Sequence, residues 1–222
     1  MAVSVIIPAL NEEEWIAGAV ESAFAAGAAE VIVVDGGSVD RTSRFATAAR
    51  ARVLLADPMR ARQLNRGAEA ASNPFLIFLH ADSRLPSGAA AAVEEALTGK
   101  TIFGGFRIQF AEPDRKLRFA ENMINYRSTL LRAPWGDQAQ FITRERFLAA
   151  GGYREMPIME DYELARRMKK AGRTRILPLQ VTTSGRRFLR KGILRTAMTN
   201  WLIISRYHQG VDLQELEKMY RG

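Results

Sequence analysis

The chain has 222 residues, 47% of them hydrophobic and none of them cysteine, and its net charge is +8. This length is enough to bury a proper core, and the composition excludes a disordered chain, disulfides, cysteine metal sites and thiol catalysis. No stretch approaches the ~18 continuous apolar residues that cross a bilayer, and the N-terminus lacks the pattern of a signal peptide. We therefore expect a cytoplasmic protein, and a peripheral position on the inner membrane face stays open.

The first hundred residues alternate strands with helices, which is typical of parallel β-α-β units. The expected strands are residues 3–8, 31–34, 52–55 and 75–79. The first helix is expected to be capped by Asn11, with Glu14 completing a capping box, and to be closed by Gly27. Further helices are expected from Asp40 to about Arg50 and over residues 59–71 and 87–97.

The second half contains the same kinds of element without a strict alternation. The expected strands are residues 102–110, 138–143 and 175–179, and the expected helices are residues 115–131, 144–150, 160–171 and the segment from about 191 onward. No internal repeat or linker divides the chain. We predict one α/β domain over residues 1–190 with a mixed, mostly parallel central sheet, followed by a helical tail (191–222). Within the domain, residues 1–100 and residues 101–190 form two halves with different element patterns; the family resemblance described below implies that they are a nucleotide-binding half and an acceptor-side half.

Acidic residues lie at the ends of three expected elements. His80-Ala81-Asp82-Ser83 follows the strand at 75–79, Asp35 ends the strand at 31–34, and a Glu160-Asp161 pair opens a helix. A carboxylate just past the carboxyl end of a buried strand lies where open α/β sheets bind ligands. The three sites together suggest a nucleotide, a metal ion and a general base.

Asp82 is the candidate metal ligand, because a hard carboxylate oxygen beside a diphosphate suits Mg²⁺ or Mn²⁺; capping of the helix that Pro86 opens is the alternative. His80 can contact the metal or a ribose, or it can be a packed structural histidine. Asp35 can accept hydrogen bonds from a base or a ribose, and Gly37 lets the backbone approach a ligand closely. Neither G-x-G-x-x-G nor a P-loop sequence is present, which argues against a dinucleotide site.

Two further groups of side chains are candidates for the same site. The Glu160-Asp161 pair can supply a general base, or it can simply be stabilised by the helix dipole. The basic helix start with Arg62 and Asn65 can reach a phosphate, or it can be a solvated face. Arg186 and Arg187 follow the last expected strand and can clamp a leaving diphosphate.

Four motifs occur in order along the chain: SVIIPALNEE (4–13), VIVVDGGSVDRT (31–42), FLHADS (78–83) and the ED of MEDYEL (159–164). Together they resemble family 2 glycosyltransferases of the GT-A fold, over residues 1 to about 180. Two more segments, MRARQLNRGA (59–68) and GDQAQF (136–141), are similar to a bacterial branch described as radical-SAM/selenodomain-associated transferases. The chain lacks the Q-x-x-R-W motif and the transmembrane helices of the processive synthases, so a single-transfer enzyme is expected.

The resemblance implies an inverting transfer of a sugar from a UDP- or GDP-linked donor to a hydroxyl acceptor, with a lipid-linked acceptor as one option. The residues implied to hold the donor are Pro8, Ala9, Asn11, Glu12, Asp35, Gly37, Arg62, Asn65, His80 and Ala81. Asp82, the last position of the D-x-D motif, would bind Mn²⁺ or Mg²⁺. Asp161, beside Glu160, would deprotonate the acceptor. His80 stands where the motif has its first Asp.

Some of the alternatives can be weighed from the residues. A nucleotidyltransferase shares the α/β framework, but Asn11-Glu12-Glu13-Glu14 replaces its Gly-rich loop with an early Arg. Nucleic-acid binding is not expected, because aromatic residues are only scattered through the basic C-terminal third. A non-catalytic protein that binds a nucleotide or a membrane surface stays open. On the acceptor side, the residues that lie about where such folds present acceptor-binding groups are Trp135, Asp137 and Gln138.

The C-terminal segment carries an apolar stripe flanked by basic residues. The stripe consists of Ile193, Leu194, Ala197, Met198, Trp201, Leu202 and Ile204, and its flanks are Arg190, Lys191, Arg195 and Arg206. Such a helix can lie at a membrane interface. The stripe can equally pack on the domain or on a second subunit of a homodimer. The net positive charge is concentrated here, because no acidic residue occurs from Arg166 to Arg195.

Overall fold

The computed structural model describes residues 2–221, which form an eight-stranded sheet in the order β3-β2-β1-β4-β7-β6-β8-β5. The strands are β1 (Val3–Ala9), β2 (Glu30–Asp35), β3 (Arg52–Leu55), β4 (Phe75–Phe78), β5 (Ser83–Arg84), β6 (Phe103–Phe110), β7 (Phe141–Thr143) and β8 (Thr174–Thr183). The four strands from β3 to β4 pair in parallel, β7 is antiparallel to both of its neighbours, and β6 and β8 are parallel again. The predicted α/β fold with a mixed, mostly parallel sheet is confirmed.

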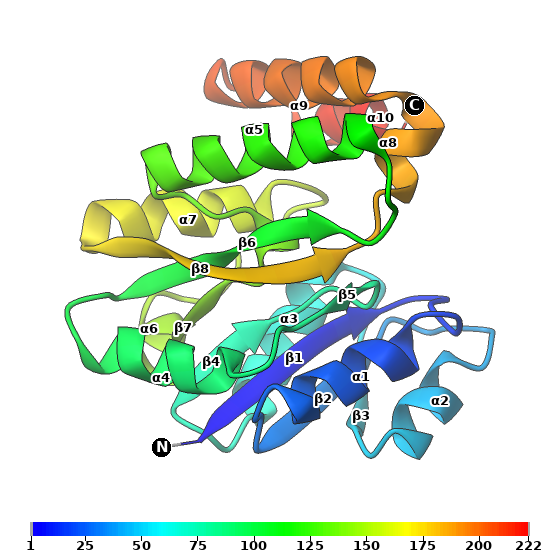
Figure 1. The fold of residues 1–222 in the computed structure, drawn as a ribbon, viewed down its shortest axis with the longest axis vertical. Coiled ribbons are helices and arrows are strands. Elements are labelled where there is room, and N and C mark those ends of the chain that lie inside the picture. The colour runs from blue at the N-terminus through cyan, green and yellow to red at the C-terminus, as the bar shows by residue number, and fades with distance from the viewer. Residues whose placement is uncertain (1, 222) are drawn as a thin grey trace.

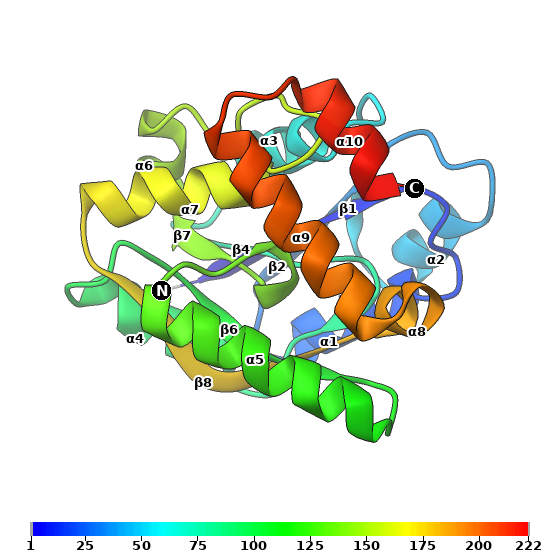
Figure 2. The same cartoon turned by 90° about the horizontal axis from the view of Figure 1, so that it is seen from above.

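Helices cover both faces of this sheet (Figures 1 and 2). They are α1 (Ile16–Ala25), α2 (Thr42–Ala48), α3 (Arg60–Ala70), α4 (Ala89–Thr98), α5 (Arg115–Leu131), α6 (Arg144–Ala149), α7 (Glu160–Ala171), α8 (Arg186–Lys191), α9 (Ile193–His208) and α10 (Leu213–Arg221), with a short 3-10 turn, η1 (Gly136–Gln138). Helices α5 and α7 have the bounds expected from the sequence. None of the helices in the described part of the chain is long and apolar enough to cross a membrane.

The central strands are apolar throughout because they are buried on both faces. Side chains alternate along a strand, so Val5 and Ile7 of β1 enter one core, whereas Ile6 between them enters the other. The first core lies under α1 and α4, and the second lies under α3, α6 and α7. Two packed faces explain why these strands are unbroken apolar runs in the sequence.

The C-terminal helices are attached to the second half of the sheet through a third, smaller core. Ile108 and Phe110 of β6 pack against Leu117 of α5, and Phe188 of α8 and Ile193 of α9 lie against them. The ring centroids of Phe110 and Phe188 are 5.1 Å apart. The predicted boundary between domain and tail, at residues 190 and 191, falls inside α8.

Asn11 does not cap the first helix, which corrects the sequence-based expectation. Its φ is 56° and the helix begins five residues later, at Ile16. The backbone N–H of Asn11 donates to the Ser38 hydroxyl, and its side-chain oxygen accepts from the N–H of Val39. Asn11 therefore joins the loop after β1 to the loop after β2.

Two strands differ from their expected extents. β8 runs on to Thr183 instead of ending near Leu179, and its pairing with β6 shifts register at Pro178 and Leu179. Proline has no N–H to donate to a neighbouring strand, so the pairing of β8 with β6 is interrupted at Pro178 and resumes at Gln180. In the segment expected as the strand 138–143, pairing begins only at Phe141 because the preceding residues form η1. The two-residue strand β5 was not predicted.

Candidate active site

The loops that carry the expected donor residues leave neighbouring parallel strands at one edge of the sheet. Ala9 of β1 pairs with Asp35 of β2, and Ile6 of β1 pairs with Phe78 of β4. The segments that follow start side by side at the carboxyl edge, where open α/β sheets bind ligands. Four of the expected donor residues are buried there: Pro8, Ala9, Asp35 and Ala81.

Asp35 fixes the shape of the loop after β2. One carboxylate oxygen accepts hydrogen bonds from the N–H of Gly37 and from the N–H and hydroxyl of Ser38, and the other accepts from the Ser43 hydroxyl. Burial alone would raise the pKa of Asp35, but these hydrogen bonds outweigh it and hold the pKa below its ordinary value. The turn requires a φ of 92° at Gly37, which glycine adopts without strain.

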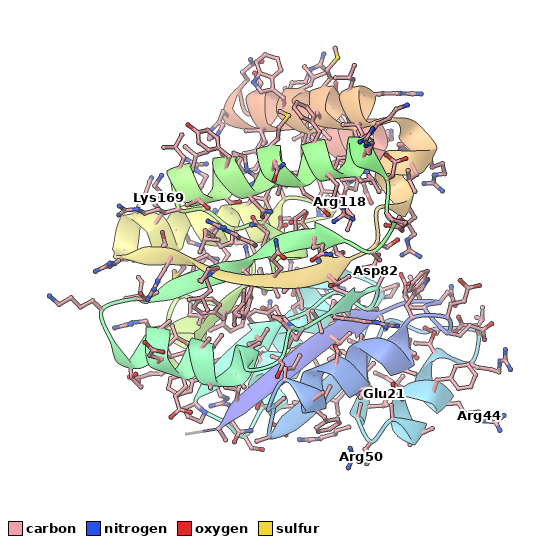
Figure 3. The ribbon with its side chains drawn as sticks, in the orientation of Figure 1. Glu21, Arg44, Arg50, Asp82, Arg118 and Lys169 are labelled. Carbon is pink, nitrogen blue, oxygen red and sulfur yellow. The ribbon has the colours of Figure 1, made fainter. Side chains whose placement is uncertain are left out.

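Asp82 and Glu12 share one guanidinium group. Arg186 at the start of α8 places Nη2 3.3 Å from Asp82 Oδ2 and 3.1 Å from Glu12 Oε1. Asp82, labelled in Figure 3, lies where β5 begins, and β5 pairs with the end of β8 that leads into α8. Burial raises the pKa of Glu12, with Arg186 opposing the shift. The N-terminal loop, the metal candidate and one predicted phosphate-binding arginine therefore meet.

Arg187, the second predicted clamp residue, points elsewhere. Its guanidinium carbon lies 3.6 Å from the centroid of the Tyr220 ring in α10. This stacking directs Arg187 toward the C-terminal helices, and among the described residues no ion pair links it to Asp82 or Glu12. Of the two predicted clamp residues, Arg186 therefore lies beside Asp82, whereas Arg187 lies against α10.

Asp161 lies in the first turn of α7 with both carboxylate oxygens oriented by backbone groups. Oδ2 accepts from the N–H of Gly136 at 2.6 Å, and Oδ1 accepts from the N–H of Tyr162 at 2.7 Å. A Cβ atom added at Gly136 would lie 2.7 Å from Asp161 Oδ2 and 3.0 Å from His80 Nε2. Only glycine allows η1 to approach this closely, so Asp161, His80 and η1 meet at one point.

Glu160 has a different role from the one expected. It is only 1% exposed, and its carboxylate forms an ion pair with Arg60 at the start of α3. Burial raises the pKa of Glu160, and the Arg60 charge opposes that shift. Arg60 also places Nη2 3.8 Å from Asp161 Oδ2. Glu160 therefore acts as a positioning residue for Arg60 rather than as a base open to an acceptor.

His80 is a neutral imidazole in this setting. Burial and the nearby Arg60 guanidinium lower the pKa of His80 to about 4, although the charges of Asp82 and Asp161 act in the opposite direction. Nε2 lies 3.4 Å from Arg60 Nη1. The histidine that replaces the first Asp of the D-x-D motif is thus uncharged near neutral pH, and it lies within the influence of both candidate carboxylates.

The three predicted acceptor residues lie in different environments. Gln138 is fully buried, and its amide donates to the Phe106 carbonyl and to the Ser128 hydroxyl. Its side chain joins η1 to β6 and α5. Trp135 is half-buried beneath the guanidinium of Arg127, 3.3 Å from the ring centroid. Asp137 has a buried Oδ1 without a hydrogen-bond partner.

Residues 4–196 match the family described as Glycosyl transferase family 2. The chain belongs to this family. The resemblance seen in the four motifs is confirmed, and so is the fold it implied. No curated protein matches the chain.

Solved structures show the same fold. A fragment of Staphylococcus aureus TarS (1–349) is 14% identical, with a TM-score of 0.64 over 99% of this chain and 69% of that one. A mycobacterial protein is 23% identical, with a TM-score of 0.57 over 82% of this chain and 65% of that one. Glucosyl-3-phosphoglycerate synthase from Mycobacterium tuberculosis, in complex with Mn²⁺, UDP and glucosyl-3-phosphoglycerate, is 22% identical, with a TM-score of 0.53 over 81% and 70% of the two chains. This chain of family 2 thus spans about two thirds of the length of each of these three structures.

Within this family 2 fold, two expected donor residues bind the protein itself. Arg62 is exposed and forms ion pairs with Asp57 and Glu155, both at 2.8 Å. Asn65 exchanges hydrogen bonds with the backbone N–H and carbonyl of Tyr153. Both side chains hold the 153–155 loop against α3.

Two residues that the sequence did not single out help to build the family 2 site. Gln63 is buried and donates to the carbonyls of Ala9 and Val34, which ties the ends of β1 and β2 to α3. It lies inside the MRARQLNRGA segment, so the family resemblance could have indicated it. Arg127 packs on Trp135, and nothing in the sequence around it indicates this role.

Asp137 gives a pH dependence that can be measured. Burial raises its pKa from 3.8 to about 6, against the attraction of Arg127. A carboxyl with a raised pKa contributes stability that is complete below pH 3.8 and is lost as the pH rises through 6. Asp137→Asn should therefore match the wild type below pH 3.8 and be more stable above pH 6. Denaturant unfolding across this range measures the difference; equal stability at every pH would contradict the assignment.

Proposed function

We propose that this protein transfers a sugar from a UDP- or GDP-linked donor to a hydroxyl acceptor, with inversion at the anomeric carbon. Membership of glycosyl transferase family 2 supports the reaction class. The observation that supports the proposal is the closeness of His80 and Asp161 at η1, where a Cβ atom added at Gly136 would lie 3.0 Å from His80 Nε2 and 2.7 Å from Asp161 Oδ2, with Asp82 two residues after His80. This closeness supports a single site, at the carboxyl edge of the sheet, for the candidate metal carboxylate and the candidate base.

Asp161 is the proposed general base. A base must come within hydrogen-bond reach of the proton that it removes, and the N–H groups of Gly136 and Tyr162 fix the direction of this carboxylate. Neutral His80 adds no competing charge beside it. The acceptor hydroxyl loses its proton to Asp161 while its oxygen attacks the anomeric carbon on the face opposite the nucleotide, and the bond to the diphosphate breaks.

Arg186 is the proposed partner of the leaving diphosphate. Its Nη2 already contacts two carboxylates from different loops, and the planar guanidinium group can bind phosphate through two of its N–H groups. Negative charge develops on the leaving group as the bond breaks, so a cation at this place stabilises the transition state more than the ground state.

The residues around Asp82 fit a divalent cation. Among residues 2–221 no cluster of three or more acidic or histidine side chains forms a complete metal cage, but Mg²⁺ and Mn²⁺ in nucleotide sites take few protein ligands and several from phosphate and water. A positive group, Arg186, already lies against the Asp82 carboxylate. The cation would neutralise the diphosphate, and Asp82 would be its protein ligand. The synthase from M. tuberculosis is described in complex with Mn²⁺ and UDP.

Thermal unfolding with UDP, GDP and CDP, each with and without Mn²⁺, tests the proposal. A ligand at about 100 times its dissociation constant adds about 2.7 kcal/mol, which raises the midpoint of a chain of this size by roughly 5–10 °C. We expect that increase with one nucleotide and only with the metal present. An unchanged midpoint under all six conditions would contradict a nucleotide-dependent transferase and favour a non-catalytic protein.

A further inference from the structure

Most of the large apolar side chains that the described chain exposes lie on three helices. Of the 15 large hydrophobic residues recorded as exposed, 10 belong to α5, α8 and α9. They are Phe119, Met123, Tyr126, Leu130, Leu131, Leu189, Leu194, Met198, Trp201 and Leu202. Single exposed apolar residues need no explanation, but a contiguous group of them marks an interaction surface.

On α5 these residues form one stripe along the outer side of the helix. The members of the stripe, spaced four, three and four residues apart, are Phe119, Met123, Tyr126 and Leu130, and all are more than half exposed. Residues at such spacings share one helix face. The residues buried against the sheet lie on the opposite side, and they include Leu117, Ala120 and Ser128. The stripe therefore points away from the protein.

The apolar stripe predicted on the C-terminal helix α9 likewise has a buried side and an exposed side. Ile193 packs into the third core, and Thr196 and Ile203 are buried. Leu194, Met198 and Trp201 lie on the other side of α9 and are 77%, 71% and 70% exposed. In Figure 2, which views the molecule from above, α5 and α9 lie next to each other on the outside of the molecule, with no other element in front of them. We call these seven residues of α5 and α9 the α5–α9 face.

The charges around the α5–α9 face are almost entirely positive. No acidic residue occurs in 122–136 or in 164–211. The only acidic residue of α5, Glu121, is buried and paired with Arg118. Exposed basic residues lie at the ends of the two helices (Arg115, Lys116, Arg132 and Arg195) and on the neighbouring α8 (Arg190). The face is thus apolar at its centre and cationic at its rim.

We propose that the α5–α9 face docks this protein on the surface of an anionic lipid bilayer. The apolar and aromatic side chains enter the boundary between headgroups and acyl chains, as on other interfacial helices, and the rim arginines lie near lipid phosphates. Trp201 and Tyr126 suit this boundary because each has an apolar ring and a polar atom. The proposal does not depend on the transfer reaction, because it concerns a surface formed by α5 and α9.

A second copy of the chain fits this face less well. A twofold dimer brings the same patch of both copies together, so the rim arginines of one copy would approach those of the other, and the only acidic residue of α5 and α9, Glu121, is already paired with Arg118. Like charges in an interface cost affinity. A bilayer that contains anionic lipid supplies the missing negative charge over a flat area.

Vesicle co-sedimentation of the full chain tests the proposal. The vesicles contain phosphatidylcholine alone or a mixture with phosphatidylglycerol, each at low and at high salt. We expect binding to the mixed vesicles at low salt and weaker binding at high salt, because salt screens the rim charges. Binding to both kinds of vesicle alike would contradict a charge-directed surface, and no binding under any condition would overturn the proposal.

Two matched variants locate the surface. Leu194→Gln combined with Trp201→Gln removes two anchors of the α5–α9 face, and we expect the partition coefficient to fall by about tenfold or more. Leu55→Gln is the control, because Leu55 is 73% exposed but belongs to β3. Unchanged vesicle binding in the double variant would overturn the assignment. So would a dimer in size-exclusion chromatography that the double variant dissociates, which would identify a second copy as the occupant.

Discussion

Asp161→Asn should lower the transfer rate by about 10²- to 10⁴-fold, which is the usual contribution of a general base, and leave nucleotide binding unchanged. Asn retains the shape of the side chain and can still accept the hydrogen bond from the N–H of Gly136, so the loop should keep its position. What is lost is the ability to take a proton from the acceptor hydroxyl. Steady-state turnover together with the nucleotide dissociation constant of the same preparation separates the two effects.

Two companion variants sharpen this test. Asp57→Asn makes the same chemical change at an exposed carboxylate that pairs with Arg62, and it should leave turnover unchanged. Gly136→Ala keeps every ionisable group but puts a methyl group 2.7 Å from Asp161 Oδ2, so it should lower kcat by displacing the base. Turnover in Asp161→Asn equal to that of the wild type would remove Asp161 from the mechanism.

The fold could be predicted because its strands and helices carry simple periodic signals. Central strands buried on both faces must be apolar. In β2 the residues between the terminal Glu30 and Asp35 are all valine or isoleucine. α7 begins at the acidic pair and ends before Gly172, where acidic and glycine residues normally mark the two ends of a helix. These signals are local in the sequence, so no knowledge of distant partners was needed.

The errors arose where a distant partner decides the conformation. Asn11 is a residue type that often caps helices, but its side-chain oxygen accepts a hydrogen bond from the N–H of Val39, which is 28 residues away. Pro178 ends a strand by local rules, yet the strand continues because β6 lies alongside to pair with it. Local preference was overruled by tertiary contacts in both cases.

The site was predicted better in position than in side-chain direction. The ends of β2 and β4 determine where Asp35 and Asp82 lie, and strand ends can be located from the sequence. Whether a long side chain turns toward the ligand depends on its neighbours in space. Arg187 stacks on Tyr220 and Asn65 binds Tyr153, and neither pairing has a signal in the sequence.

Asp82→Asn should abolish the part of the nucleotide-induced stabilisation that requires Mn²⁺. An amide oxygen is a neutral and much weaker ligand for a hard divalent cation than a carboxylate. At a nucleotide concentration about 100 times the wild-type dissociation constant, the midpoint increase of roughly 5–10 °C should fall to the value seen without metal. The readout is the unfolding midpoint, so it does not depend on turnover or on knowing the acceptor.

Glu12→Gln is the matched control for Asp82→Asn. Glu12 and Asp82 each place an oxygen within 3.3 Å of the same Arg186 nitrogen, so both variants remove one negative partner of that arginine. Only the Asp82 variant removes the proposed metal ligand. The Mn²⁺-dependent shift should survive in Glu12→Gln and disappear in Asp82→Asn. Loss of the shift in both variants would mean that the orientation of Arg186, and not a metal on Asp82, governs nucleotide binding; retention in both would place the cation elsewhere.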